Sequence, residues 1–150
     1  NPGHNEVMTP SDASPVTILD DEECWAFLAG HEVGRLVTSI GGDPEIYPIN
    51  FVVDGEGVVF RTSEGSKLLA ITIGAPAAFE VDRWDAAGGT SVIARGRARE
   101  LDSDAERAHA ETLGLRPWVP THKAHWVSLD VTSISGRRFV FGPEPVDDVA

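Results

Sequence analysis

Apolar and polar residues alternate in short runs along the chain from residue 33 onward, and glycine-containing turns separate these runs. Alternation over about four to eight residues is typical of a strand with one buried face, and turns such as Gly41-Gly42-Asp43-Pro44 favour hairpins. The runs predicted to be strands are residues 33–40, 45–53, 58–62, 77–84, 91–101, 125–131 and 134–141. Short connections between so many strands favour a mainly β fold, an antiparallel barrel of six or seven strands.

Three short helices are predicted between these strands. Asp20 followed by Glu23 forms a capping-box pattern, and the helix that it opens ends at Gly30. A second helix is predicted over residues 66–73 and a third over residues 102–113. We expect the first of them to lie across the end of the sheet.

The chain of 150 residues is predicted to hold one domain, over residues 17–142. Residues 1–16 are polar, contain prolines and have no apolar periodicity, so they are predicted to be a disordered lead-in. Residues 1–7 precede Met8 and are interpreted as left over from expression. Residues 143–150 are predicted to be an acidic, flexible tail. We expect both ends to be dispensable for folding.

The formal net charge of −12 is concentrated at the two ends of the chain. Between Arg35 and Gly142, fourteen acidic residues stand against twelve basic ones. A nearly neutral domain lacks the continuous basic surface that nucleic acid requires, so no nucleic-acid partner is expected. No apolar run reaches the roughly 18 residues of a membrane span, and Cys24 has no second cysteine to pair with. We therefore expect a cytoplasmic protein without a membrane partner.

Residues that favour phosphate binding follow the third predicted strand. This strand ends at Arg61-Thr62, and a small-residue loop then leads into the helix that begins at Ser66-Lys67. The first N–H groups of a helix favour an anion, and Arg61 and Lys67 add positive charge. The segment therefore predicts a phosphate-monoester site. An exposed basic strand end beside an ordinary helix cap is the alternative interpretation.

A succession of segments resembles the FMN-binding core of the pyridoxamine 5'-phosphate oxidase-like family, in particular its nitroimidazole-reductase-like subgroup. The segments are Gly34-Arg35-Leu36-Val37, Pro48-Ile49-Asn50-Phe51-Val52-Val53, Val59-Phe60-Arg61-Thr62, Gly65-Ser66-Lys67, Phe79-Glu80-Val81-Asp82, Ser91-Val92-Ile93-Ala94-Arg95-Gly96-Arg97-Ala98, Pro117-Trp118 and Ile134-Ser135-Gly136-Arg137-Arg138-Phe139. The likeness spans about residues 20–141. No one segment is diagnostic, but their order and spacing are.

The resemblance implies an FMN-binding split β-barrel that forms a homodimer, holds FMN at the dimer interface and oxidises or reduces a small organic molecule. It places Ile49 and Asn50 along the flavin ring, mostly through backbone groups. It places the remaining residues near the ribityl chain, at the phosphate, or in segments that reach the flavin of the other protomer. The cofactor-binding residues that it implies are Ile49, Asn50, Arg61, Thr62, Ser66, Lys67, Ser91, Trp118, Arg137 and Arg138.

The resemblance does not extend to every member's activity. The true pyridoxamine phosphate oxidases carry additional basic and aromatic residues at the C-terminus for the substrate phosphate, whereas this chain ends in an acidic tail. A reductase of the same fold that uses 8-hydroxy-5-deazaflavin is one alternative. A non-catalytic flavin- or haem-binding module, with His31 or His125 as haem ligand, is another.

No catalytic acid, base or nucleophile is identified from the sequence, and flavin chemistry requires none. No metal site is expected, because His122 and His125 lack a third ligand nearby in the sequence. Two further rows of charge are predicted to form a cross-strand ion ladder. The acidic row is Glu80 and Asp82, and the basic row is Arg95, Arg97 and Arg99.

Overall fold

The computed structural model describes residues 14–63, 73–119 and 123–146. These residues form one antiparallel sheet with the strand order β3-β2-β6-β7-β8-β5-β4, and β1 pairs with β8 beside this path. The strands are β1 (Val16–Leu19), β2 (Val33–Ile40), β3 (Asp43–Asn50), β4 (Val52–Asp54), β5 (Gly57–Thr62), β6 (Pro76–Trp84), β7 (Gly88–Glu100) and β8 (His125–Val140). The helices are α1 (Asp21–Ala29) and α3 (Asp104–Glu111).

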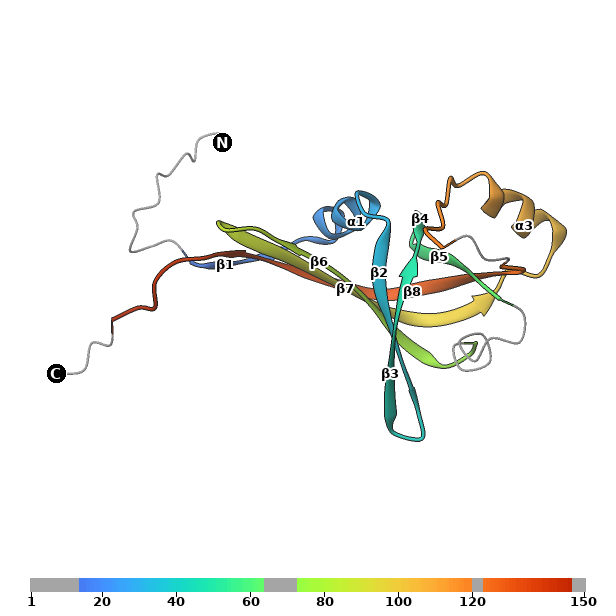
Figure 1. Ribbon diagram of the computed structural model, residues 1–150, viewed down its shortest axis with the longest axis horizontal. Helices are drawn as coiled ribbons and strands as arrows, with labels where there is room; N and C mark the ends of the chain where they lie inside the picture. The colour runs from blue at the N-terminus through green and yellow to red at the C-terminus, as the bar shows by residue number, and fades with distance from the viewer. Residues whose placement is uncertain (1–13, 64–72, 120–122, 147–150) are drawn as a thin grey trace.

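The sheet has an elongated, curled shape (Figure 1). At one end β6, β7, β8 and β1 extend together as an arm, and the β2–β3 hairpin projects away from the middle of the sheet. Helix α1 lies over the sheet near the base of the arm, and α3 lies at the opposite end. This arrangement confirms the predicted mainly β, antiparallel split-barrel fold.

The core lies between α1 and one face of the sheet. Alternate residues of β6 and β7 point into it, and the ring of Phe79 packs edge-on against Phe51 with centroids 4.7 Å apart. Helix α1 contributes Cys24 and Leu28, both fully buried. Burial raises the pKa of the Cys24 thiol, and the acidic side chains at the start of α1 raise it further. The prediction that Cys24 is a small buried side chain is confirmed.

The start of α1 is the predicted capping box. The Asp20 carboxylate accepts a hydrogen bond from the Glu23 N–H at 2.8 Å, and the Glu23 carboxylate accepts one from the Asp20 N–H at 3.0 Å. These two bonds satisfy backbone donors that a helix start otherwise leaves unpaired. Among the residues that the structure describes, no helix is long and apolar enough to cross a membrane.

The C-terminal part of the sheet differs from the prediction. Residues 125–131 and 134–141 were expected to be two strands, but β8 is one strand of sixteen residues. Its pairing with β7 continues through a single irregularity between Arg95 and Gly96, where Thr132 is the extra residue on β8. A bulge of this kind bends a strand without ending it. The helix predicted over residues 66–73 lies almost entirely outside the described residues.

The predicted ion ladder is wrong because the strand register does not oppose the two charged rows. Arg95 lies opposite Ala78, and Arg97 lies opposite Pro76. The third basic residue, Arg99, lies beyond the end of β6 and donates to Asp130 at 2.7 Å. The β6 carboxylates of Glu80 and Asp82 instead form ion pairs with Arg35 of β2.

We expect Gly34→Ala to lower the free energy of unfolding by about 1–3 kcal/mol, because overpacking a core displaces its side chains. A Cβ at this position would lie 2.2 Å from the Phe79 ring. Denaturant unfolding measures the change. The matched control is Gly30→Ala, where the nearest atom is 3.6 Å away and the loss should be small. Adding Phe79→Leu to Gly34→Ala should cost less than the sum of the two changes; simple additivity would contradict the clash.

Candidate functional site

A cavity of about 200 Å³ lies where the ends of β3 and β5 meet the segment that follows α3. We call it the strand-end pocket. Its walls are Pro48, Ile49 and Asn50 from β3, Arg61, Thr62 and Ser63 at the end of β5, and Leu115, Pro117, Val119 and Lys123 from the segment after α3. The pocket brings together four of the residues predicted from the sequence, Ile49, Asn50, Arg61 and Thr62.

Arg61 gives the strand-end pocket its most distinctive chemistry. Its guanidinium carbon lies 4.6 Å from the centroid of the Trp126 ring, and the two residues are register partners on β5 and β8. Its Nε is buried and has no hydrogen-bond partner among the residues that the structure describes. Buried polar groups are nearly always paired, and an arginine fork matches the oxygens of carboxylates and phosphates. The orphan donor therefore fits an anionic ligand.

The side chain of Asn50 holds the two walls of the pocket together. Its Oδ1 accepts a hydrogen bond from the Trp118 N–H at 2.9 Å, and its Nδ2 donates to the carbonyl oxygen of Glu32 at 3.3 Å. The amide thus fixes the segment after α3 against β3. Trp118, another residue predicted from the sequence, does not line the pocket, although its neighbours Pro117 and Val119 do, and it is 66% exposed.

Two further predicted residues, Ser91 and Arg137, lie elsewhere. They are register partners on β7 and β8, on the face of the sheet turned away from α1. With five neighbours they line a cavity of about 300 Å³, which we call the outer-face cavity. The neighbours are Ile93, Arg95, Ser135 and Phe139, together with the backbone of Gly136. The outer-face cavity and the strand-end pocket share no described lining residue.

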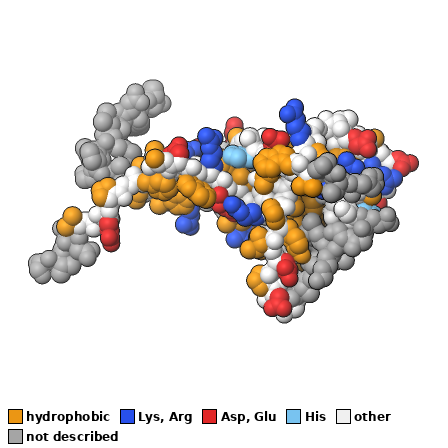
Figure 2. Space-filling view, viewed as in Figure 1, with side chains coloured by type: hydrophobic (Ala, Val, Ile, Leu, Met, Phe, Trp, Pro, Cys, Tyr) orange, Lys and Arg blue, Asp and Glu red, His pale blue; other side chains and the backbone are white. Residues whose placement is uncertain are grey.

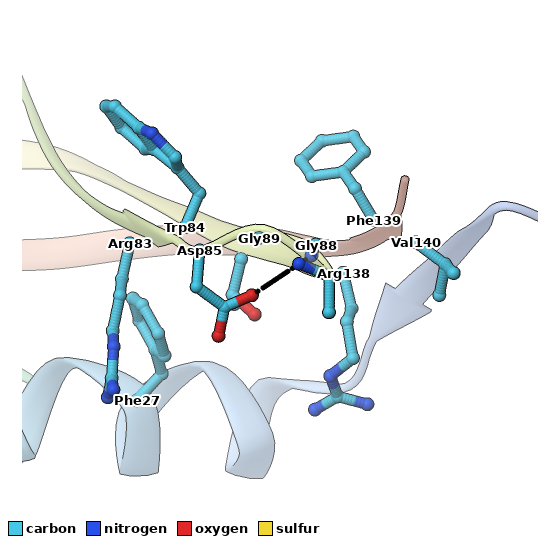
Figure 3. Close-up of a pocket in the computed structure, with 11 residues that line it drawn as sticks. Phe27, Arg83, Trp84, Asp85, Gly88, Gly89, Arg138, Phe139 and Val140 are labelled. Atoms are coloured by element: carbon cyan, nitrogen blue, oxygen red, sulfur yellow. Dashed lines mark hydrogen bonds between the residues drawn. The ribbon is translucent and has the colours of Figure 1, made fainter. Parts of the chain in front are cut away.

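Arg138 points to the other face of the sheet, as consecutive strand residues do. Its Nη2 lies 3.9 Å from the Glu23 carboxylate of α1, and it lines a cavity of about 370 Å³ at the end of the arm. Figure 3 shows Arg83 and Arg138 on the side of α1, and Trp84 and Phe139 on the opposite side. The last two predicted residues, Ser66 and Lys67, lie outside the described residues.

A charged triad connects the two predicted regions across the sheet. One guanidinium nitrogen of Arg35 lies 2.6 Å from a Glu80 oxygen and 3.1 Å from an Asp82 oxygen. Arg35 is the register partner of Pro48 in the strand-end pocket, and Asp82 is the partner of Ser91 in the outer-face cavity. Burial raises the pKa of Glu80 to about 7; the neighbouring Asp82 adds to this rise and Arg35 opposes it.

The sequence interpretation missed several residues of the strand-end pocket. Leu115, Val119 and Lys123 come from an aperiodic segment whose position is set by Asn50. Trp126 was not among the predicted site residues, although the pairing of β5 with β8 places it opposite Arg61. One signal in the sequence could have identified Trp126. It lies in a predicted strand, residues 125–131, that is long enough to pair with residues 57–62.

Comparison with known proteins identifies relatives of the whole domain. The profile of the family described as pyridoxamine 5'-phosphate oxidase matches residues 20–138. The structure of the FAD binding protein from Mycobacterium smegmatis is 43% identical, with a TM-score of 0.77, and the match covers 83% of this chain and 99% of that one.

Two further relatives come from Corynebacterium diphtheriae and Mycobacterium tuberculosis. A conserved protein of unknown function from Corynebacterium diphtheriae is 40% identical with a TM-score of 0.74, over 85% of this chain and 100% of that one. An uncharacterized protein from Mycobacterium tuberculosis strain H37Rv is 32% identical over 148 residues, which cover 93% of this chain and 95% of that one.

We expect the carboxyl group of Glu80 to make stability depend on pH. Because its pKa in the fold is about 7, above the ordinary 4.5, the folded state favours the protonated form. The contribution of the Glu80 carboxyl to the free energy of unfolding is therefore fully present below about pH 4.5 and is lost as the pH rises through about 7. Between pH 5 and 8 the urea midpoint of the wild type should fall further than that of Glu80→Gln.

The control for this comparison is Glu56→Gln, in the exposed turn before β5. It should keep the pH dependence of the wild type. Equal pH dependence in wild type and Glu80→Gln would contradict the assignment to Glu80.

Proposed function

Because the chain belongs to the pyridoxamine 5'-phosphate oxidase family, we propose that it binds FMN with the phosphate in the strand-end pocket and oxidises or reduces a small organic molecule. The observation that carries the proposal is the buried, unpartnered Nε of Arg61 in the wall of that pocket. A phosphate oxygen is a suitable acceptor for it. The flavin relative from Mycobacterium smegmatis supports the cofactor class.

The donors around Arg61 suit a phosphate monoester. Thr62 and Ser63 add hydroxyl groups at the end of β5, and the Lys123 ammonium lines the same pocket. The stacking of Arg61 on Trp126 holds the guanidinium plane in one orientation, so less conformational freedom is lost when a ligand binds. Ser66 and Lys67, which follow this strand in the sequence, would complete the phosphate site.

The apolar part of the pocket suits a flat ring. Pro48 and Ile49 on one side, and Leu115, Pro117 and Val119 on the other, give the space between them apolar walls. When bound, the flavin would supply the hydride and electron transfer, and the protein's part is to bind and orient the ring. The Asn50 amide contributes by holding the second wall in place.

The cofactor can be identified on the purified protein. FMN binding predicts flavin absorption bands and, after denaturation, a released molecule with the mass of FMN. FAD is the second candidate, since the relative from Mycobacterium smegmatis is an FAD binding protein. A released mass of FAD would keep the flavin and replace FMN, whereas a deazaflavin or haem Soret spectrum would overturn the proposal. Oxidation of NADH or NADPH with a nitroaromatic acceptor then tests turnover.

We expect Arg61→Gln to weaken FMN binding about tenfold or more, because charge-assisted hydrogen bonds to the phosphate are lost. Riboflavin has no phosphate and should lose much less affinity. Fluorescence titration of both flavins measures the difference, and Arg107→Gln, on α3 and outside the lining of the strand-end pocket and of the outer-face cavity, is the matched control. The same comparison applies to Lys67→Ala. Equal losses for FMN and riboflavin would place the phosphate elsewhere.

We also propose that the cofactor lies at the interface of a homodimer. The strand-end pocket, about 200 Å³, is smaller than the roughly 300–1,000 Å³ of typical ligand pockets, so further walls are needed. Ser91 and Arg137 suit that purpose but line a separate cavity of the same chain. Large apolar side chains are also exposed on the arm, including Ile18 at 68% and Trp84 at 67% (Figure 2). A second copy that covers the arm buries them and brings its Arg137 to the first copy's pocket.

Mixed dimers test this shared site. A chain with Arg61→Ala and a chain with Arg137→Ala should each bind FMN poorly alone. In a heterodimer, one site carries both defects and the other carries neither, so about half of the wild-type binding should return. Differently tagged chains purified in tandem provide the heterodimer. If it binds no better than either parent, each site is built within one chain.

A further inference from the structure

Helix α3 is attached to the sheet by few buried contacts. It lies at the end of the molecule opposite the arm (Figure 1), and of its eight residues only Ala110 is buried. Ala110 belongs to a small apolar cluster, separate from the core under α1, whose other buried members are Val59, Leu101 and Trp126. The helix therefore contributes little to the main core of the fold.

A cavity of about 320 Å³ separates the first part of α3 from the sheet. We call it the α3 cavity. Its lining residues are Ala105, Glu106 and His109 from the helix, and Asp54, Val59, Arg99, Leu101 and Ser128 from the strands and their ends. It shares no described lining residue with the strand-end pocket. Protein interiors are normally close-packed, so a space of this size leaves the helix room to move.

Two ion pairs cross the α3 cavity. The Glu106 carboxylate accepts a hydrogen bond from Arg99 at 2.5 Å, and the Asp54 carboxylate lies 3.1 Å from Nε2 of His109. The four side chains are between 36% and 61% exposed, and ion pairs as exposed as these contribute little to stability. They orient the helix without fixing it to the sheet.

The segment after α3 connects the helix to the strand-end pocket. Leu115 packs against the same cluster as Ala110 and also lines the pocket. Between them, Gly114 ends the helical turn with a φ of 77°, a left-handed conformation that favours glycine. Beyond Leu115, the N–H of Trp118 donates to the side chain of Asn50 at 2.9 Å. A displacement of α3 therefore moves the second wall of the pocket with it.

We propose that residues 103–119 move as one lid, which opens the strand-end pocket to admit its ligand and closes on it. This inference rests on the proposed flavin site and concerns how the flavin enters and leaves. Opening breaks the apolar contacts of Ala110 and Leu115 and the bond between Trp118 and Asn50. The core under α1 and the pairing of β7 with β8 stay intact. Segments with few buried contacts open at the lowest free energy, and lids commonly gate ligand exchange.

Hydrogen exchange of the ¹⁵N-labelled full chain, without flavin, tests whether the lid is one unit. Ala105→Leu adds apolar surface at the α3 cavity and should slow opening. Exchange at the amides of residues 109–113 and at the Trp118 amide should slow by the same factor, about three- to tenfold. The matched control is Ala108→Leu, an exposed position of α3 that does not line the cavity, and it should leave both unchanged.

A second variant acts in the opposite direction. Ala110→Gly removes the buried methyl group of α3 and should speed exchange at residues 109–113 and at Trp118 together. Its control is Ala108→Gly, which lowers helix propensity equally but removes no buried group. Exchange should therefore be about threefold or more faster in Ala110→Gly than in Ala108→Gly.

The lid also predicts a specific effect on FMN kinetics. Entry and exit both require opening, so Ala105→Leu should lower the association and dissociation rate constants by the same factor that it slows exchange. Because the lid is closed in both the free and the bound protein, Kd should change little. Stopped-flow flavin fluorescence measures both rate constants. A residue that only stabilised the bound pocket would change Kd through dissociation alone.

Three results would overturn the proposal. The first is exchange at residues 109–113 that changes while the Trp118 amide does not, since the helix would then move alone. The second is exchange that responds to neither Ala105→Leu nor Ala110→Gly beyond their controls. The third is unchanged FMN rate constants in a variant whose lid amides exchange more slowly. Joint slowing of exchange without any FMN binding would instead count against the proposed flavin site, because the movement is measured without flavin.

Discussion

The pairing of β7 with β8 is the interaction on which the rest of the structure depends. It runs along all thirteen residues of β7, from Gly88 opposite Val140 to Glu100 opposite Val127. Strand β6 pairs with the free edge of β7, and β5 and β1 pair with β8, so both ends of the sheet are built on this ladder. Its register also decides which face each side chain takes. A slip of one residue would exchange the positions of Arg137 and Arg138 and move core residues into solvent.

Two buried polar side-chain atoms have no hydrogen-bond partner among the described residues. These are the Nε of Arg61, in the wall of the strand-end pocket, and the Oγ1 of Thr38, on the inner face of β2. Leaving such an atom unpaired costs about 1–3 kcal/mol, which a folded domain of marginal stability does not readily absorb. Both atoms lie where paired strands end or separate, because there the backbone ladder no longer closes the structure. A ligand atom that paired with the Nε of Arg61 would offset this cost at the strand-end pocket.

The features that the sequence predicted well are local ones. The capping box of Asp20 and Glu23, the burial of Cys24 and the alternation of β6 and β7 depend on residues close together in the chain. The grouping of Ile49 with Arg61 was predicted by family resemblance. The triad of Arg35 with Glu80 and Asp82 was missed because it depends on the register between β2 and β6, which no local pattern encodes. The continuity of β8 was missed for a similar reason: Thr132 and Ser133 interrupt the alternation, but pairing with β7 carries the strand through the bulge.

The position of Cys24 makes the chain's one thiol a reporter of local opening. Its sulfur lies on the inner side of α1 against Gly136 of β8, where a Cβ at that glycine would be 2.8 Å away. Because the thiol is fully buried and its pKa is raised, an alkylating reagent reacts only after α1 lifts from the sheet. The labelling rate then gives the free energy of that single movement, independently of global unfolding. With no other cysteine to react, mass spectrometry of the intact chain would follow the helix directly.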